Sequence, residues 1–176
     1  MKGFILKKIL VFLAFIFKIL SANDLEFSTL ESDFTQVVTS KDKSIIYSGH
    51  FIADSNFSAF WEYKTPNLKL VYFSKSNITI LEPDLEQAVI SNLSDAPDIS
   101  ALLAKAKQVD KNAFEASFDD IKYLIFTRNS LPVRIDYTDK LGNDVKISLK
   151  NTRKNEIINK ELLEPKIPKN YDIVTN

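Results

Sequence analysis

The chain has 176 residues, no cysteine, and equal numbers of basic and acidic residues, 23 of each. A chain of this length builds one domain with a sizeable core, and after its first 22 residues it has 19 basic and 23 acidic residues, a net charge of −4. This mixed, mildly acidic composition argues against binding to nucleic acid or to an anionic membrane surface, and the lack of cysteine excludes disulfides and thiolate metal sites.

The start of the chain has the pattern of a signal peptide. Lysines precede a short apolar core, and Ser21-Ala22 provide small residues before a cut. The apolar run is too short to span a bilayer of ~30 Å comfortably. We therefore expect residues 1–22 to be cleaved, residues 23–176 to form a single domain, and the product to reach the periplasm. Since Asn23, and not a cysteine, follows the cut, we expect no lipid anchor.

The first half of the chain changes its hydrophobic period once. Residues 24–40 carry apolar side chains at helical steps, at Phe27, Leu30 and Phe34, which predicts an amphipathic helix. From residue 44 the period is two, and short breaks rich in turn residues favour antiparallel neighbours. Gly49 is expected to form a bulge. The predicted strands cover residues 45–54, 60–64, 68–73, 77–82 and 85–93.

The second half begins with another helical pattern. Pro97 and Asp98 are helix-start signals, and residues 99–110 have apolar side chains at helical spacing. Leu141-Gly142-Asn143 predicts a hairpin turn. Strands are predicted over residues 115–120, 121–129, 131–139, 143–151 and 155–163, and an extended segment over residues 164–174.

Several of these strands carry apolar side chains on both sides. In residues 68–73 and 121–129 large apolar groups point both ways, whereas residues 131–139 alternate cleanly. A strand buried on both sides is most simply explained by core packing. Continuous antiparallel strands with few helices favour a mainly β fold with some α, in which one strongly curved sheet has its concave face covered by helices. Such a sheet can enclose an apolar cavity of roughly 300–1,000 Å³.

The residue types argue against an enzyme. His50 is the single histidine, and no serine has the G-x-S-x-G context of a nucleophile. Histidine-rich metal sites are excluded by the count, and we expect no cofactor. Carboxylate pairs such as Asp119-Asp120 are typical of solvated turns. A polar pocket with two converging carboxylates would favour an enzyme, and an apolar pocket favours a binding protein.

Six short motifs occur in an order that is similar to the LolA family, the periplasmic outer-membrane lipoprotein carriers. No single motif is specific, but together they cover nearly all of the chain after the signal peptide. They are DFTQ (33–36), a strand led by Gly49, FWEYKTP (60–66), EPDLEQAVI (82–90), LPVRIDYTDKLGNDVKISLKN (131–151) and EPKIPKNYDIV (164–174).

The resemblance implies a fold and a function. The family fold is an incomplete antiparallel β-barrel covered by a lid of amphipathic helices. Its members accept triacylated lipoproteins from an inner-membrane ABC transporter, shield the acyl chains, and deliver the cargo to the outer membrane, where a lipid-anchored receptor of the same fold can accept it. We expect the chain to act as a monomer. The alternative is a lipid-binding or envelope-stress-sensing domain of the same fold.

The resemblance also suggests which residues hold the cargo. Family members carry a lid-latching arginine six residues after the glycine of the strand, where this chain has Ser55, and Glu82 stands where a tyrosine is frequent. The expected lid residues are Phe27, Leu30, Phe34, Leu102 and Leu103. The expected acyl-chain contacts on the sheet are Phe51, Phe60, Trp61, Tyr63, Leu70, Tyr72, Ile80, Val133, Ile135, Ile147 and Leu149.

Overall fold

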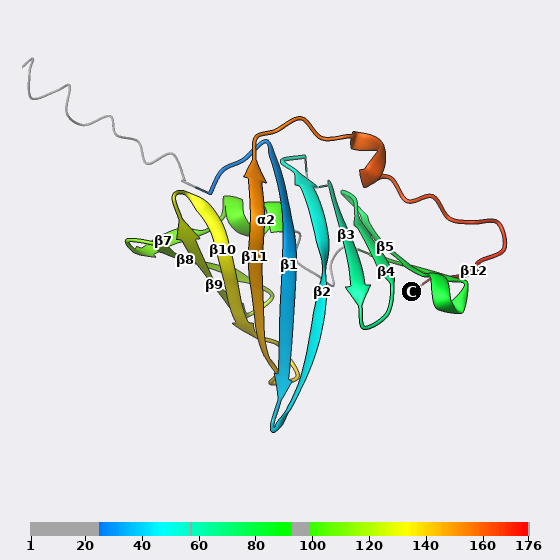
Figure 1. The fold of residues 1–176 in the computed structure, drawn as a ribbon, viewed down its shortest axis with the longest axis horizontal. Coiled ribbons are helices and arrows are strands. Elements are labelled where there is room, and N and C mark those ends of the chain that lie inside the picture. The colour runs from blue at the N-terminus through cyan, green and yellow to red at the C-terminus, as the bar shows by residue number, and fades with distance from the viewer. Residues whose placement is uncertain (1–24, 57, 93–98, 176) are drawn as a thin grey trace, which may run out of the picture.

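Twelve strands form one open, curved sheet in the computed structural model, which describes residues 25–56, 58–92 and 99–175 (Figure 1). The strands lie in the order β12-β6-β5-β4-β3-β2-β1-β11-β10-β9-β8-β7. The predicted curved, mainly antiparallel sheet is confirmed. The strands are β1 (Thr29–Ser40), β2 (Lys43–Asp54), β3 (Ser58–Thr65), β4 (Lys69–Phe73), β5 (Asn77–Glu82), β6 (Gln87–Asn92), β7 (Lys107–Asp110), β8 (Ala113–Phe118), β9 (Ile121–Arg128), β10 (Leu131–Thr138), β11 (Asp144–Lys154) and β12 (Asp172–Thr175).

The predicted signal peptide, residues 1–22, lies outside the described residues. Within the part of the chain that the structure describes, no helix is long and apolar enough to cross a membrane.

Strand β1 replaces the helix predicted over residues 24–40, so that prediction is wrong. β1 lies near the middle of the sheet and pairs with β2 on one side and β11 on the other. Leu30, Phe34 and Val38 are four residues apart, and a spacing of four fits one side of a strand as well as one side of a helix. Pairing on both sides and several β-branched residues favour the strand. Leu30 and Phe34 therefore belong to the sheet, and Phe27 precedes it.

The second predicted helix is present but short. Helix α2 (Ile99–Ala104) ends six residues before the predicted limit at Asp110, because residues 107–110 form β7 against β8. α2 lies against β2, β3 and β8. Its Leu102 and Leu103 are 6% and 1% exposed. In the described residues α2 is the only α-helix, so the predicted lid of two amphipathic helices is not observed.

Two glycine predictions are confirmed. The pairing of β2 with β3 shifts register between Ser48 and Gly49, as expected for a bulge. The turn between β10 and β11 contains Gly142 at φ +80° and closes with the backbone N–H of Asp139 donating to the carbonyl oxygen of Asn143 at 2.9 Å. The Asp139 carboxylate also accepts the backbone N–H groups of Leu141 and Asn143.

The C-terminal segment crosses from one half of the sheet to the other (Figure 1). The prediction of a strand over residues 155–163 is wrong. Residues 160–163 form a short 3-10 helix, η3 (Lys160–Leu163), which the Asn159 side chain caps and which lies against β3. A second 3-10 turn, η1 (Pro83–Leu85), joins β5 to β6. The segment predicted to be extended, residues 164–174, contains a turn in which the backbone N–H of Tyr171 donates to the carbonyl oxygen of Pro168 at 3.2 Å. It then enters β12, which adds to the edge of β6 as a parallel strand.

Candidate functional site

The pairing register divides the sheet into two faces. Directly opposite residues of neighbouring strands point to the same side. Phe34 lies opposite Leu149 of β11, and Phe51 of β2 lies opposite Trp61 of β3, which lies opposite Val71 of β4. We call the side that α2 covers the inner face and the other side the outer face, because Leu102 of α2 lines the same cavity as these inner residues.

Most of the predicted contact residues share the inner face. These are Phe51, Trp61, Tyr63, Ile80, Ile135, Ile147 and Leu149, together with Leu30 and Phe34 of β1 and Leu102 and Leu103 of α2. The structure brings them together across β1–β5, β10 and β11. Phe27 packs against this core from just before β1.

Three predicted contact residues point the other way. Phe60, Leu70 and Tyr72 lie on the outer face, where the rings of Phe60 and Tyr72 stack with centroids 4.8 Å apart. Val133 sits at the register shift between Pro132 and Arg134. Ser55 is exposed just after β2, and its backbone N–H donates to the carbonyl oxygen of Ser28 at 2.9 Å. The structure does not gather these residues with the inner set.

One end of the inner face is filled by side chains. Leu30, Phe51, Ala53, Ala59 and Leu103 are at most 1% exposed. The rings of Phe51 and Trp61 stack with centroids 4.5 Å apart, and Phe34 meets Trp61 edge-on at 5.0 Å. This packing forms the closed end of the space between the sheet and α2.

Next to the filled end lies a small cavity of about 230 Å³. Among the residues that the structure describes, no charged side chain lines it. Its walls are Gln36, Trp61, Tyr63, Val71, Phe73, Ile99, Leu102, Tyr123, Ile135, Tyr137 and Ile147. The cavity is smaller than the usual range for small-molecule sites.

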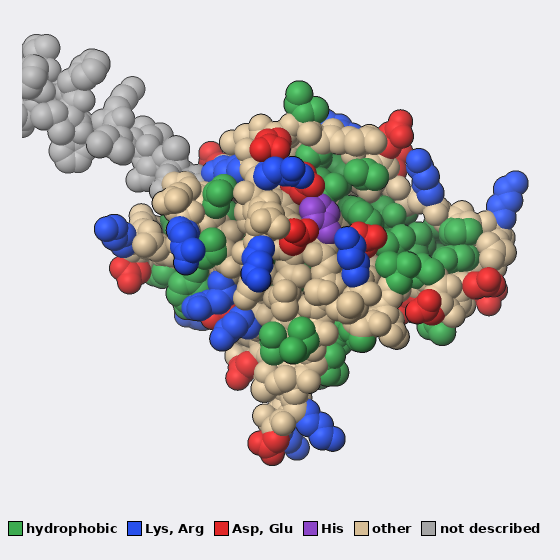
Figure 2. Space-filling view, in the orientation of Figure 1, with side chains coloured by type: hydrophobic (Ala, Val, Ile, Leu, Met, Phe, Trp, Pro, Cys, Tyr) green, Lys and Arg blue, Asp and Glu red, His purple; other side chains and the backbone are tan. Residues whose placement is uncertain are grey.

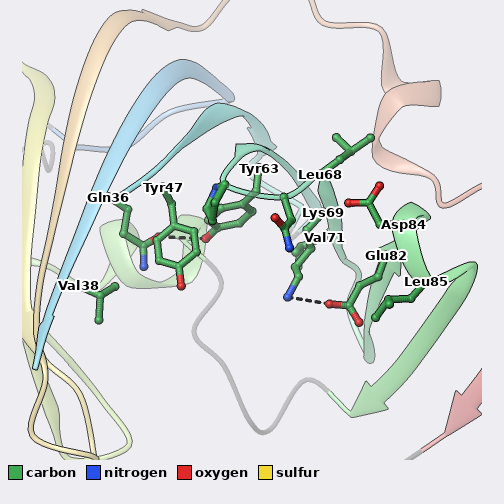
Figure 3. Close-up of a pocket in the computed structure, with 12 residues that line it drawn as sticks. Gln36, Val38, Tyr47, Tyr63, Leu68, Lys69, Val71, Glu82, Asp84 and Leu85 are labelled. Carbon is green, nitrogen blue, oxygen red and sulfur yellow. Dashed lines mark hydrogen bonds and ion pairs between the residues drawn. The ribbon is translucent and has the colours of Figure 1, made fainter. Parts of the chain in front are cut away.

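A wider cleft of about 530 Å³ continues from this cavity toward the β3–β4 turn and η1 (Figure 3). The cavity and the cleft share Gln36, Tyr63 and Val71. Lys69 and Glu82 line the cleft, with Lys69 Nζ 3.0 Å from Glu82 Oε1. The inner face therefore runs from packed core through an apolar cavity to a cleft with charged residues.

The tyrosines of the cavity are uncharged at neutral pH. Burial raises the pKa of Tyr63 to about 12, and its hydroxyl donates to Gln36 Oε1 at 3.1 Å. Burial likewise raises the pKa of Tyr137, whose ring lies 4.7 Å from that of Tyr123. The site presents apolar surface and neutral hydroxyl and amide groups, which suits an uncharged, largely apolar ligand.

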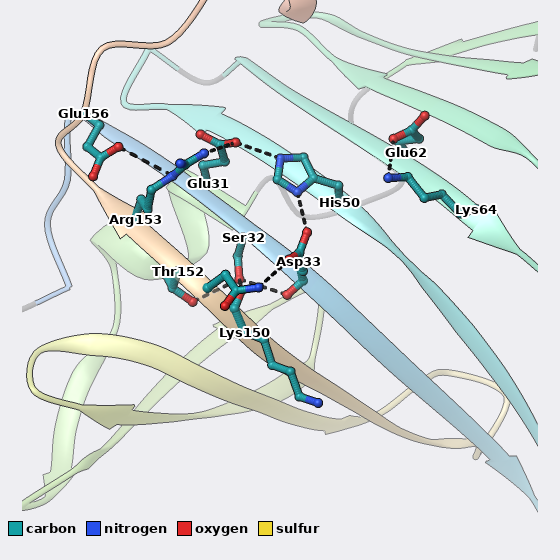
Figure 4. A network of polar contacts seen from close by, with 11 residues as sticks. Glu31, Ser32, Asp33, His50, Glu62, Lys64, Lys150, Thr152, Arg153 and Glu156 are labelled. Carbon is teal, nitrogen blue, oxygen red and sulfur yellow. Dashed lines mark hydrogen bonds and ion pairs between the residues drawn. The ribbon is translucent and has the colours of Figure 1, made fainter.

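The outer face carries a separate polar network around His50 (Figure 4). His50 Nδ1 lies 2.8 Å from Asp33 Oδ1, and Nε2 lies 3.0 Å from Glu31 Oε1. Arg153 Nη2 also contacts Glu31 at 2.6 Å. Figure 2 views this face, where charged side chains are interspersed with hydrophobic groups. Because both ring nitrogens face carboxylates, His50 ties β2 to β1 and is not placed to activate a serine. In the described residues no group of three or more His, Cys, Asp or Glu side chains is arranged so that it could hold a metal ion.

Several cavity residues were missed in the sequence prediction. Val71 and Phe73 alternate with Leu70 and Tyr72, so the prediction took the wrong side of β4. Tyr137 shares a face with the predicted Ile135, and this alternation was a usable signal. Gln36 gave no signal, because its place in the cavity depends on the pairing of β1 with the distant β11. Tyr123 shares a face with Tyr137 through the pairing of β9 with β10, and it was not singled out.

The chain matches the family described as "Outer membrane lipoprotein carrier protein LolA" over residues 26–166. It belongs to the LolA family. A protein of Campylobacter jejuni named outer-membrane lipoprotein carrier protein is 43% identical over 168 residues, covering 96% of this chain and 98% of that protein. A Wolinella succinogenes protein of the same name is 35% identical over 136 residues, covering 76% of this chain and 79% of that protein.

Solved structures agree on the LolA-like fold. A LolA superfamily protein from Nitrosomonas europaea matches with a TM-score of 0.51 at 9% identity, covering 82% of this chain and 94% of that chain. An uncharacterized conserved protein from Thermus thermophilus matches with a TM-score of 0.54 at 11% identity, covering 88% and 94%. The sequence resemblance to the LolA family is thus confirmed, and the family is one of carriers rather than enzymes.

Proposed function

We propose that this protein carries lipoproteins through the periplasm to the outer membrane, holding their acyl chains against the inner face. The observation that carries the proposal is the cavity around Trp61, whose described walls are apolar and aromatic side chains together with the neutral amide of Gln36. Family membership supplies the class of cargo, because the relatives are named outer-membrane lipoprotein carriers.

The proposed acyl-chain contacts are the inner-face residues of the sheet and α2. Phe60, Leu70 and Tyr72 are left out because they face the other side. The cavity of about 230 Å³ is small for triacylated cargo, so we propose that α2 moves away from Trp61 and Tyr63 when acyl chains enter. Leu102 and Leu103 would then exchange contacts with the sheet for contacts with the ligand.

The energetics require partners at both ends of the route. Burial of one methylene is worth about 0.8 kcal/mol, so a long acyl chain gains on the order of 10 kcal/mol on leaving water. A bilayer offers the same gain. We therefore propose an energised donor, an inner-membrane ABC transporter that releases triacylated lipoproteins, and an acceptor at the outer membrane that binds them more tightly.

The test adds purified protein, residues 23–176, to spheroplasts that are synthesising lipoproteins, and measures lipoproteins in the soluble fraction bound to it. Val71→Asp places a charge on the inner face, whereas Leu70→Asp places the same charge on the outer face of the same strand. We expect release with the wild type and with Leu70→Asp, and at least a tenfold loss with Val71→Asp.

Circular dichroism of both variants verifies that they are folded. Absence of release by the wild type, with an active transporter from the matching organism, would overturn the carrier function and leave a lipid-binding domain as the better account. An equal loss of lipoprotein release by Val71→Asp and Leu70→Asp would show that the inner face is not the site that holds the acyl chains.

A further inference from the structure

The inner face of β3, β4 and β5 changes polarity in steps along the strands. Ala59, Phe73 and Ile78 lie side by side at the filled end, and Trp61, Val71 and Ile80 form the next row. The third row is Tyr63, Lys69 and Glu82. Since each row is two residues further along, the rows are about 7 Å apart. The surface thus passes from wholly apolar to charged within about 14 Å.

The charged row faces the cleft. Lys69 Nζ lies 3.0 Å from Glu82 Oε1, and the two side chains are 42% and 25% exposed (Figure 3). A pair this exposed contributes only about 0–1 kcal/mol to folding. Stability alone therefore gives little reason for a charged pair on the inner face. Its position gives a reason of another kind, because the cleft that it lines shares Gln36, Tyr63 and Val71 with the apolar cavity.

The cleft also offers neutral hydrogen-bonding groups. Gln36, Tyr47 and Asn67 line it beside Lys69 and Glu82. Lysine has three donor hydrogens and no acceptor, and the ammonium of Lys69 forms an ion pair with Glu82. The Gln36 carbonyl accepts from Tyr63, which leaves the amide nitrogen of Gln36 as its donor. The cleft combines donors from Lys69, Gln36, Tyr47 and Asn67 with the acceptor oxygens of two carboxylates, Glu82 and Asp84.

We propose that this cleft binds the ester and amide groups that join the acyl chains to the N-terminal cysteine of the cargo peptide. The proposal rests on the carrier function and adds the orientation of the ligand. The ester carbonyls accept hydrogen bonds from Lys69 and its neighbours, and Glu82 accepts a peptide N–H. The acyl chains extend from this row past Val71 and Trp61 toward α2. The peptide leaves the cleft near Leu68 and Leu85, which are 38% and 66% exposed.

This arrangement distinguishes acylated peptides from bare hydrocarbon. A hydrocarbon fills the apolar cavity but forms no hydrogen bond at the third row. An ester or amide carbonyl placed there replaces its water partners with the Lys69 ammonium, and a hydrogen bond to a charged donor is among the stronger ones in proteins. The Lys69–Glu82 pair therefore determines specificity for the ester and amide groups of the ligand, and the apolar cavity binds its acyl chains.

The experiment measures binding of two probes through the fluorescence of Trp61, the single tryptophan of the chain. One probe is a tripalmitoylated cysteinyl peptide, and the other is diphenylhexatriene, a hydrocarbon without polar groups. Lys69→Met removes the charge and retains the length of the side chain. Lys64→Met is the matched control, because Lys64 makes a similar pair with Glu62, at 3.3 Å, on the outer face.

We expect Lys69→Met to weaken lipopeptide binding about tenfold, the equivalent of 1.4 kcal/mol, and to leave diphenylhexatriene binding within about twofold of the wild type. Glu82→Gln, which retains an acceptor, is expected to have a smaller effect on the lipopeptide alone. Lys64→Met is expected to change neither probe.

The outcomes separate this proposal from the carrier function. Unchanged lipopeptide binding by Lys69→Met, or an equal loss for both probes, would overturn the role of the cleft while wild-type binding and lipoprotein release persist. Failure of the wild type to bind the lipopeptide or to release lipoproteins would instead overturn the carrier function.

Discussion

The indole of Trp61 stacks on the phenyl ring of Phe51, with ring centroids 4.5 Å apart and planes 16° apart. The two residues are directly opposite on β3 and β2. Phe51 is wholly buried, and Trp61 has 8% of its surface exposed and lines the cavity. The stack therefore joins the packed core to the wall of the proposed acyl-chain site.

Replacement of Phe51 tests this packing. Phe51→Ala removes a ring with 0% exposure and should lower the free energy of unfolding by about 3–5 kcal/mol, the usual cost of such a cavity. Urea unfolding followed by circular dichroism measures the change. Ile157→Ala, at a wholly exposed position, should stay within about 0.5 kcal/mol of the wild type. A loss below about 1 kcal/mol for Phe51→Ala would contradict the packed end of the site.

Substitution by alanine is expected to lower the free energy of unfolding by different amounts at the two glycines that the structure describes. A Cβ at Gly49 would lie 1.8 Å from the carbonyl oxygen of Glu62 and 2.9 Å from Phe34 Cε1. Gly49→Ala should therefore push β2 from β3 and lower the free energy of unfolding by at least about 3 kcal/mol. Gly142 has φ +80° and nothing near its Cβ position, so Gly142→Ala should cost only about 1–2 kcal/mol. Thermal unfolding compares them, and equal costs would be inconsistent with the close contact at Gly49.

The hydrogen bonds of Asp33 predict that the stability of the folded protein falls in acid. The side-chain hydrogen bond from Asn151, and then that from His50, hold the pKa of Asp33 below its usual value. A lowered pKa in the folded state stabilises the protein above the unfolded pKa of about 3.9, and this stability is lost as the pH falls through the folded pKa. Because half of the Asp33 side chain is exposed, the effect should be small.

Asn151→Ala removes the largest cause of that shift. We expect the pKa of Asp33 to rise toward its usual value. Asn151 has a φ of +54°, so alanine there also adds a backbone cost that does not depend on pH. The variant should therefore be less stable than the wild type at both pH values, and by more near pH 7 than near pH 2. Nuclear magnetic resonance titration of the carboxyl group, with urea unfolding at both pH values, measures this. Asn92→Ala, at the exposed end of β6, should leave the titration unchanged. A stability difference of the same size at both pH values would contradict the role of Asp33 and leave the backbone cost as the whole effect.

Sequence reasoning predicted the strands best where one face is polar. β10 and β11 alternate between apolar residues such as Ile135 and charged residues such as Lys146, and both were predicted close to their observed bounds. The prediction was wrong at β1, because the spacing of Leu30 and Phe34 fits either period and the pairing with β11 connects segments more than 100 residues apart. Periodicity contains no information on such a distant partner.

The facing of residues was harder to predict than the strands. β4 carries apolar side chains on both sides, so composition could not choose between Val71 and Tyr72. The bulge at Gly49 also shifts β3 against β2, and a shift of one residue reverses which side chains point inward. The outer-face positions of Phe60, Leu70 and Tyr72 follow from this register, which only the assembled sheet defines.

Removal of the last strand, β12, is expected to change self-association more than stability. β12 adds to β6 through backbone pairing of residues 172–175 with residues 87–90, and its Ile173 and Val174 remain 59% and 37% exposed. A chain that ends at Tyr171 should lose at most about 2 kcal/mol of stability, because few hydrogen bonds and little apolar burial are removed. It should self-associate more strongly, since the unpaired edge of β6 becomes available to another chain.

Sedimentation over a range of protein concentrations measures that association, and we expect the full chain to remain monomeric while the truncated chain forms larger species. Ile173→Thr is the control, because threonine retains the backbone pairing and a β-branched side chain while reducing the exposed apolar surface. A truncated chain that stays monomeric would contradict the protective role of β12. If Ile173→Thr also self-associates, the loss of the Ile173 side chain, and not exposure of the β6 edge, causes the association.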